Sequence, residues 1–198
     1  MTHLGQVVGE KSRYHALTSG STLNPAILSG RLKAMKVPDR YREIRNRLPI
    51  GEMSFGCGGI KLFGVAELED GQIGNSVAPH GNSLYRGETG AWEPNWLVIG
   101  YETACGDPIF IDVRGVTLPV FTAIHGEGTW EPTQIAPTIE AFVKCIEEFS
   151  RISVGRSNPV ERDANPLSEA ERTEFLHRIA QANQASTAPE FWDVLLEA

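Results

Sequence analysis

Cysteine is scarce in this sequence, and its three cysteines, Cys57, Cys105 and Cys145, are widely spaced. An odd number at such spacing gives neither a disulfide framework nor paired metal ligands, so we expect free thiols in a reducing compartment. Long apolar runs are also lacking, because no stretch approaches the roughly 20 residues of a membrane-spanning helix. The opening residues MTHLGQVVGE lack the apolar region of a secretory signal. We therefore expect a cytoplasmic protein without a membrane partner.

Motifs for metal and cofactor binding are missing as well. The five histidines show no ligand spacing such as HxxxH. The stretch GEMSFGCGG lacks the GxGxxG spacing, and no helical pattern follows it directly, which argues against a dinucleotide site. The sequence therefore predicts no metal and no cofactor.

Basic residues are outnumbered, 18 to 25, and the net charge of -7 argues against nucleic-acid binding. Residues 1–50 nevertheless carry nine bases and three acids, or +6, whereas the remainder carries nine bases and 22 acids, or -13. In the segment RLKAMKVPDRYREIRNR, an apolar stripe of Tyr41, Ile44 and Leu48 is typical of a helix whose charged face is solvated. Its arginines are Arg40, Arg42, Arg45 and Arg47. A phosphate-binding patch is the less favoured interpretation, because Tyr41 is the segment's single aromatic residue.

Two helices are expected before the glycine-rich stretch. The first has Asn24 as its N-cap and Pro25 at its first position. The second opens at Pro38 and ends near Leu48, because Pro49 disfavours helical geometry in the residue before it.

The middle of the chain alternates apolar runs with short turns, which is typical of an antiparallel meander. We predict strands at 60–63, 96–101, 109–113 and 118–124, and the last three have connections too short for parallel crossovers. Pro119 cannot donate a ladder hydrogen bond, so we expect it at a strand start or an edge. A helix is predicted to lay one face on the sheet through Ile139, Phe142, Val143, Ile146 and Phe149. The fold class is therefore α+β, an antiparallel (mixed) sheet with flanking helices.

The end of the chain differs in composition from the rest. SVGRSNPVERDANP is interpreted as a surface connector, and capping boxes at Ser168 with Glu171 and at Thr187 with Glu190 predict two helices. Their apolar residues are Phe175, Leu176 and Ile179 on one, and Phe191, Trp192, Leu195 and Leu196 on the other. We expect a domain at 1–155 with a helical extension at 156–198 that packs on it. The alternative is that the tail forms a dimer seam, so the protein is a monomer or a homodimer.

The order of several segments is similar to one known family. These segments are PDRYRE, the glycine cluster, WLVIG, GDPIFID, PVF and IAPTIEAF. Preceded by a helix and taken in this order, they resemble the SUKH superfamily, the Smi/Knr-type domain, and the resemblance covers roughly Asn24 to Phe149. The resemblance implies an α+β domain without catalytic chemistry, which in many bacteria is an immunity protein that binds a toxin, often a nuclease or a deaminase. Fungal relatives act in cell-wall regulation, so a regulatory or scaffold role is the alternative.

Acidic residues are concentrated between Trp92 and Glu131, where six acids stand against one base, Arg114. Such a surface suits a partner with a basic cleft. The predicted partner-binding residues are Trp92, Glu102, Asp107, Asp112, Glu127, Trp130 and Glu131. Trp92 and Trp130 would be the anchors. The alternative is that the acids are solvated loop ends and the tryptophans belong to the core.

A cysteine hydrolase is one competing hypothesis. Cys105 would be its nucleophile, His80 or His125 its base, and Asp112 the group that orients the base. The predicted turn at Cys105 has no helix start near it that would activate the thiol, so we favour an incidental thiol.

A pair of carboxylates, Asp107 and Asp112, is the second catalytic hypothesis. Along a strand of period two they would point to opposite faces, whereas glycosidases need carboxyls that face one substrate. We expect local roles instead, with Asp107 accepting from turn amides and Asp112 capping the next turn. The sequence therefore predicts a protein that is not an enzyme.

Overall fold

The computed structural model describes residues 37–186 and 189–197, and the helix expected after Asn24 lies outside them. Six strands form one sheet in which every neighbouring pair is antiparallel and the strands follow in chain order. They are β1 (Gly51–Phe55), β2 (Gly58–Leu62), β3 (Trp96–Glu102), β4 (Pro108–Asp112), β5 (Val120–Thr122) and β6 (Thr133–Ala136). The predicted α+β class is confirmed, and the sheet contains two strands, β1 and β6, that were not predicted from the sequence.

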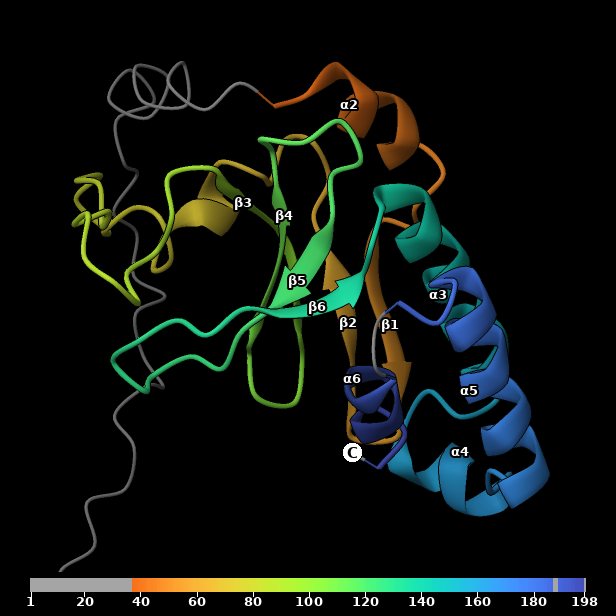
Figure 1. Ribbon diagram of the computed structural model, residues 1–198. Coiled ribbons are helices and arrows are strands. Elements are labelled where there is room, and N and C mark those ends of the chain that lie inside the picture. Colours follow the sequence, from red (N-terminus) through yellow and green to blue (C-terminus); the bar gives the residue numbers. More distant parts are fainter. Residues whose placement is uncertain (1–36, 187–188, 198) are drawn as a thin grey trace, which may run out of the picture.

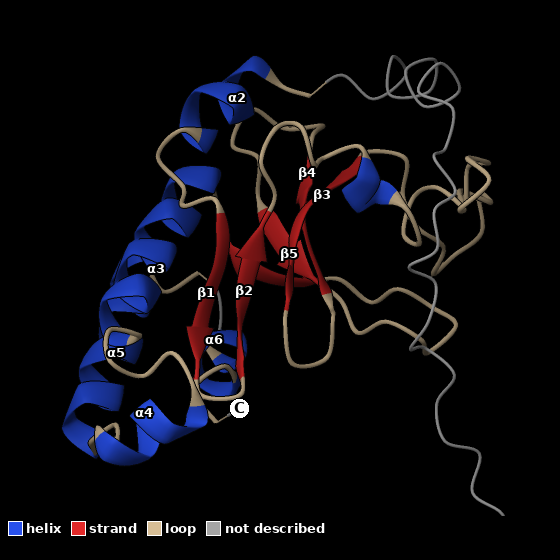
Figure 2. Cartoon of the chain, turned by 180° about the vertical axis from the view of Figure 1, so that it is seen from behind, coloured by secondary structure: helices blue, strands red, loops and turns tan. Residues whose placement is uncertain are grey.

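Five α-helices and one short 3-10 helix lie in the described part of the chain. They are α2 (Asp39–Arg45), η1 (Asp70–Gln72), α3 (Ile139–Ile152), α4 (Pro159–Ala164), α5 (Glu169–Ala182) and α6 (Glu190–Val194). The α-helices gather on one side of the sheet, and α6 lies beside the lower ends of β1 and β2 (Figure 1). Figure 2 shows the long loops on the opposite side. Among the helices described, none is both long and apolar enough to cross a membrane.

The long helix α3 supplies the apolar face that covers the sheet. Thr138 caps its start, because the side-chain oxygen accepts a hydrogen bond from the amide of Ala141 at 3.0 Å. All five predicted core residues of this helix are buried, and Phe149 packs on Phe55 of β1 with ring centroids 6.5 Å apart. The helix is confirmed, and it continues to Ile152.

The β2–β3–β4 region contains one irregularity that its residue types explain. The register of β3 against β4 shifts between Val98 and Gly100. The buried side chain of Gln72 bonds both backbone groups of Val98, donating to the carbonyl at 2.9 Å and accepting from the amide at 3.1 Å. A Cβ on Gly100 would lie 2.2 Å from the carbonyl oxygen of Lys61, so only glycine allows β2 to approach here.

Two predicted element boundaries are wrong. The strand expected at 118–124 covers Val120–Thr122, because Leu118 has a left-handed φ of 49°. The helix α2 ends at Arg45 rather than near Leu48, because the amides of Arg47 and Leu48 donate to carbonyls only three residues back.

The apolar stripe of α2 is buried as predicted, but Arg45 is not on the solvated face. It is 3% exposed. Its Nε donates to the carbonyl of Phe63 at 2.5 Å, and its Nη1 donates to those of Leu48 and Pro49 at 2.9 and 3.1 Å. No carboxylate pairs with it in the described residues. Arg45 therefore fastens the end of α2 to the end of β2 through backbone carbonyls alone.

The segment interpreted as a surface connector contains the helix α4. Asn158 caps it by accepting from the amide of Glu161 at 3.0 Å, and Pro159 occupies its first turn. None of its residues is buried. A helix without an apolar face gives no periodic signal, which is why the pattern did not predict it.

At the end of the chain, α5 packs on α3 and α6 contacts the sheet. The predicted capping box of Ser168 and Glu171 opens α5, whereas α6 has Pro189 at its N-cap and Thr187 lies outside the described residues. Trp192 is 0% exposed, and its indole Nε1 donates to the carbonyl of Ile135 in β6 at 3.2 Å. The side-chain Nδ2 of Asn183 donates to the same carbonyl at 3.0 Å.

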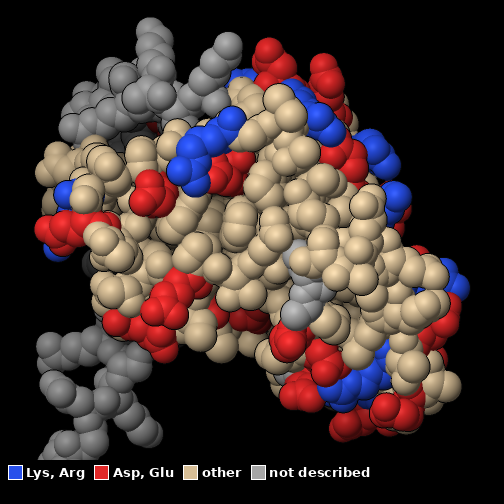
Figure 3. Space-filling view, viewed as in Figure 1, with Lys and Arg blue, Asp and Glu red and all other residues tan. Residues whose placement is uncertain are grey.

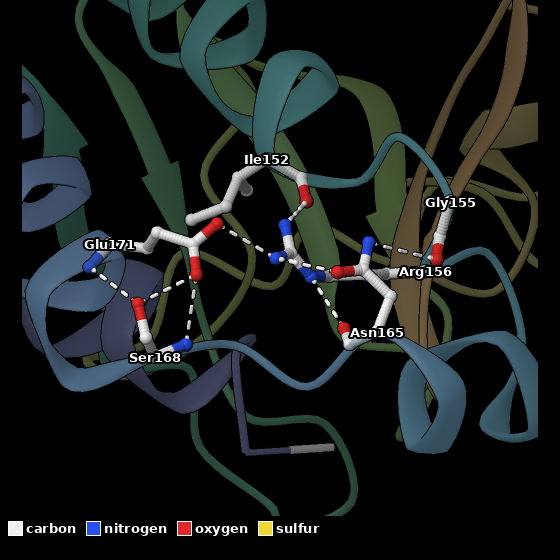
Figure 4. Close-up of polar contacts among 6 residues, drawn as sticks. All are labelled: Ile152, Gly155, Arg156, Asn165, Ser168 and Glu171. Carbon is white, nitrogen blue, oxygen red and sulfur yellow. Dashed lines mark hydrogen bonds and ion pairs between the residues drawn. The ribbon is translucent and has the colours of Figure 1, made fainter.

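A buried arginine joins the body to the tail helices (Figure 4). Arg156 donates to the carbonyls of Ile152 and Asn165 at 3.0 and 2.9 Å, and to the carboxylate of Glu171 at 2.8 Å. The carboxylate of Glu171 also accepts from the backbone and side chain of Ser168. These contacts tie the end of α3 to the start of α5.

The Glu171 contacts predict how stability responds to acid. Hydrogen bonds from Ser168, then from Arg156, lower the pKa of Glu171 from 4.5 to about 2. A lowered pKa in the folded state means that the carboxylate stabilises the fold above pH 4.5, and that this contribution is lost as the pH falls toward about 2. In urea unfolding we expect the stability advantage of the wild type over Glu171→Gln to shrink across this interval. Glu169→Gln, an exposed neighbour in the same first turn, should show no such change.

Candidate functional site

A groove opens between three segments that are far apart in the sequence. Its walls are the β3–β4 turn, the segment from β5 to β6, and α6 with the residues after it. The volume is about 650 Å³. We call it the acidic groove, and it is lined by Glu102, Ala104, Cys105, Asp107, Thr122, Ala123, Ile124, Glu127, Glu131, Thr133, Glu190, Phe191, Val194, Leu195 and Glu197. Its size is that of a site for a ligand or a protruding segment.

The charge of the acidic groove has one sign. Six of its lining residues are Asp or Glu, and none is Lys or Arg. Figure 3 shows acidic side chains on both sides of a hollow at the lower edge of the molecule. Glu127, Glu131 and Glu190 are exposed and have no hydrogen-bond or ion-pair partner in the described part of the chain. Their carboxylates are therefore available to a cationic partner.

Apolar side chains line the groove between these acids. Ile124 is 59% exposed and Val194 is 63% exposed, although both are large aliphatic residues. Phe191 is half-buried beside Val194, and Leu195 and Ala123 are buried beneath. The groove thus combines an apolar floor with an acidic rim.

Glu102 shapes the groove but is not free to bind a partner. It is 8% exposed, and its two carboxylate oxygens accept from the amides of Ala104 and Cys105. The Cys105 bond measures 2.8 Å. We predicted Glu102 as a partner contact, but its carboxylate stabilises the β3–β4 turn instead. This is the role that the sequence assigned to Asp107.

Asp107 joins two walls of the groove. Its Oδ1 accepts from the backbone amide of His125 at 2.9 Å and lies 2.8 Å from the imidazole Nδ1 of the same residue. The contact fastens the β3–β4 turn to the chain that follows β5. We expected Asp107 to cap its own turn, but its carboxylate lines the groove and is paired with His125 instead.

Asp112 lies at the other end of β4 and does not line the groove. Its Oδ1 accepts from the amide of Arg114 at 2.9 Å, which confirms the predicted turn cap. Burial alone would raise the pKa of Asp112, but hydrogen bonds from the Arg114 side chain and backbone outweigh it, and the pKa is lowered. This carboxylate is a paired anion remote from the groove, and its predicted contact with a partner stays a prediction.

The two predicted tryptophan anchors lie outside the groove. Trp92 is 2% exposed, with its Nε1 donating to the carbonyl of Trp96 at 3.3 Å. Trp130 is half-buried and packs edge-on against Trp92, with ring centroids 5.0 Å apart. The core interpretation of Trp92 therefore replaces the anchor interpretation, because a buried ring has no face left for a partner. Trp130 belongs to the edge of the same cluster.

The groups of the cysteine hydrolase hypothesis are only partly brought together. Cys105 is exposed and lines the groove, and His125 is held by Asp107 rather than by Asp112. No hydrogen bond joins the Cys105 thiol to an imidazole in the described residues, and His80 is not among the lining residues. Cys145 is buried, and burial raises the pKa of its thiol to about 12, so it is unreactive.

Metal binding finds no support in residues 37–186 and 189–197, where no group of three or more His, Cys, Asp or Glu is placed to hold an ion.

The contribution of α6 to the groove is what sequence reasoning missed. The tail was expected to pack on the body, but the wall formed by Glu190, Phe191 and Val194 depends on where it docks. The local sequence signal for this wall was a pair of acids, Glu190 and Glu197, at the two ends of an apolar segment. Comparison of the chain with protein-family models, with curated proteins and with solved structures found no match.

Proposed function

We propose that this protein is a non-catalytic binding protein that neutralises a cognate bacterial toxin, in the manner of a SUKH-type immunity protein. One observation supports this most: six acids and no base line the acidic groove. Nuclease and deaminase toxins need basic clefts for phosphate, and an acidic surface is complementary to such a cleft. The binding residues on this proposal are Glu127 and Glu131, joined by Glu190.

The proposal is tested with the protein encoded by the neighbouring gene. Co-expression should restore growth, and the purified pair should form a stoichiometric complex. In Glu127→Lys/Glu131→Lys/Glu190→Lys, association at low salt should slow by about tenfold or more and lose much of its salt dependence. The matched control is Glu43→Lys/Glu88→Lys/Glu147→Lys, which changes the net charge equally at exposed acids outside the groove.

Two results would count against the proposal. Equal association rates for the two triple variants would exclude the acidic groove as the toxin-binding surface. If no neighbouring gene product binds, an intracellular regulatory scaffold of the same fold becomes the better account.

A cysteine hydrolase is the second candidate, because Cys105 and Asp107, two residues apart in the chain, both line the groove, and Asp107 is paired with the imidazole of His125. We expect Cys105→Ser to leave neutralisation and melting temperature unchanged, because its side chain has no activating contact in the described residues. Growth rescue and a thermal melt measure both. Loss of rescue in a folded Cys105→Ser protein would favour the hydrolase.

A further inference from the structure

The apolar floor of the acidic groove restricts what kind of partner surface can fill it. A rim of carboxylates alone attracts any cation, but Ile124 and Val194 leave large aliphatic surfaces in water. Covering such surfaces is favourable by about 25 cal/mol for each Å² removed from water. The occupant that gains most therefore carries apolar side chains for the floor.

The free carboxylates lie on two different walls. Glu127 and Glu131 belong to the segment between β5 and β6, whereas Glu190 begins α6. An occupant that satisfies both walls needs cations on both sides of its apolar row. This pattern is that of an amphipathic segment in which Lys or Arg residues flank apolar residues.

We propose that the acidic groove binds a cationic amphipathic segment that protrudes from the partner protein, with two or three apolar side chains on the floor and Lys or Arg against Glu127, Glu131 and Glu190. The inference rests on the proposed function, because it takes the groove as the partner site. The volume of about 650 Å³ suits a few side chains rather than the flat face of a folded domain.

The groove is held open by contacts that do not use these three acids. Asp107 ties the β3–β4 turn to His125, Arg162 donates to the carbonyl of Leu196 at 2.8 Å, and Arg172 pairs with Asp193 at 2.7 Å. Each wall is thus anchored separately. A preformed groove lowers the ordering cost of binding, so a short segment can bind without a large interface.

The test uses the full chain and a fluorescently labelled 14-residue peptide of Leu and Lys in helical amphipathic order. Anisotropy titrations should show saturable binding to the wild type. Glu127→Lys/Glu131→Lys/Glu190→Lys should weaken it at least tenfold, and Glu43→Lys/Glu88→Lys/Glu147→Lys by less than threefold. Melting temperatures report that both variants are folded.

The floor is tested separately with small polar substitutions at exposed positions. Ile124→Ser/Val194→Ser should weaken peptide binding at least threefold, whereas Val116→Ser/Val160→Ser, at exposed valines outside the groove, should leave it unchanged. A peptide with the same composition in an order that forms no apolar face should bind at least tenfold more weakly than the amphipathic one.

Several outcomes would overturn the inference. They are no binding of the amphipathic peptide, equal binding of the scrambled peptide, or equal loss in both charge variants. Intact toxin neutralisation by a variant that has lost the peptide would overturn it too, while leaving the proposed function in place. Peptide binding as expected, with no toxin binding by the wild type, would instead reject the proposed function and keep the groove as a site for cationic segments.

Discussion

Trp192→Ala is expected to lower the free energy of unfolding by about 3–5 kcal/mol, the usual cost of truncating a buried tryptophan. The side chain is 0% exposed and packs against Phe142 and Phe149 of α3, with ring centroids 6.1 and 6.5 Å apart. Its indole also donates to Ile135 of β6. One residue of a five-residue helix therefore holds α6 to both α3 and the sheet.

Urea unfolding measures this loss, and Val194→Ala is the matched control in the same helix. Val194 is 63% exposed, so its truncation should cost less than about 1 kcal/mol. The destabilisation by Trp192→Phe should fall between those of Trp192→Ala and Val194→Ala. Phenylalanine keeps an aromatic ring but cannot donate a hydrogen bond to the carbonyl of Ile135. A cost below about 1 kcal/mol for Trp192→Ala would mean that α6 is not docked in solution.

Arg45→Met is expected to destabilise the fold by about 2–4 kcal/mol. Methionine keeps much of the aliphatic stem but removes donors from the carbonyls of Phe63, Leu48 and Pro49. Buried acceptors without donors carry their full desolvation penalty. Arg45→Met also removes the desolvation penalty of a buried charge. The expected destabilisation is therefore smaller than the sum of the energies of the lost hydrogen bonds.

Arg47→Met provides the comparison for Arg45→Met, since Arg47 is exposed two residues away and should change stability by less than about 0.5 kcal/mol. Arg45→Lys should be nearly as damaging as Arg45→Met, because an ammonium cannot reach carbonyls on two sides as the guanidinium fork does. Wild-type stability in Arg45→Lys would show that charge alone, rather than this geometry, is required.

The sequence was informative wherever an apolar pattern was long or a cap was local. The helix at Ile139 and the central strands carry repeated large apolar residues, and their burial follows directly from that pattern. The Ser168 capping box and the Asp112 turn cap are contacts within three residues, so they require no knowledge of the tertiary fold.

The missed elements lacked such signals. β1, with the sequence GEMSF, is short and partly polar, and β6, with the sequence TQIA, lies between two prolines. Both strands are defined by the neighbour that they pair with rather than by their own alternation. At the groove, the acids at 102, 107, 127 and 131 came from sequence, but Glu190 required the long-range docking of Trp192.

The carbonyl of Ile135 lies on an edge strand of the sheet, where another copy of the chain could pair and aggregate. β6 ends the sheet, and Ile135 has no partner in the register with β5. An unpaired edge is a template on which another chain can add a strand and begin to aggregate. Asn183 and Trp192 already saturate this acceptor, and the tail that carries them shields the edge. We therefore expect the C-terminal extension to prevent aggregation through the edge of β6. A chain cut after Ser157 should precipitate rather than remain in solution as a less stable monomer.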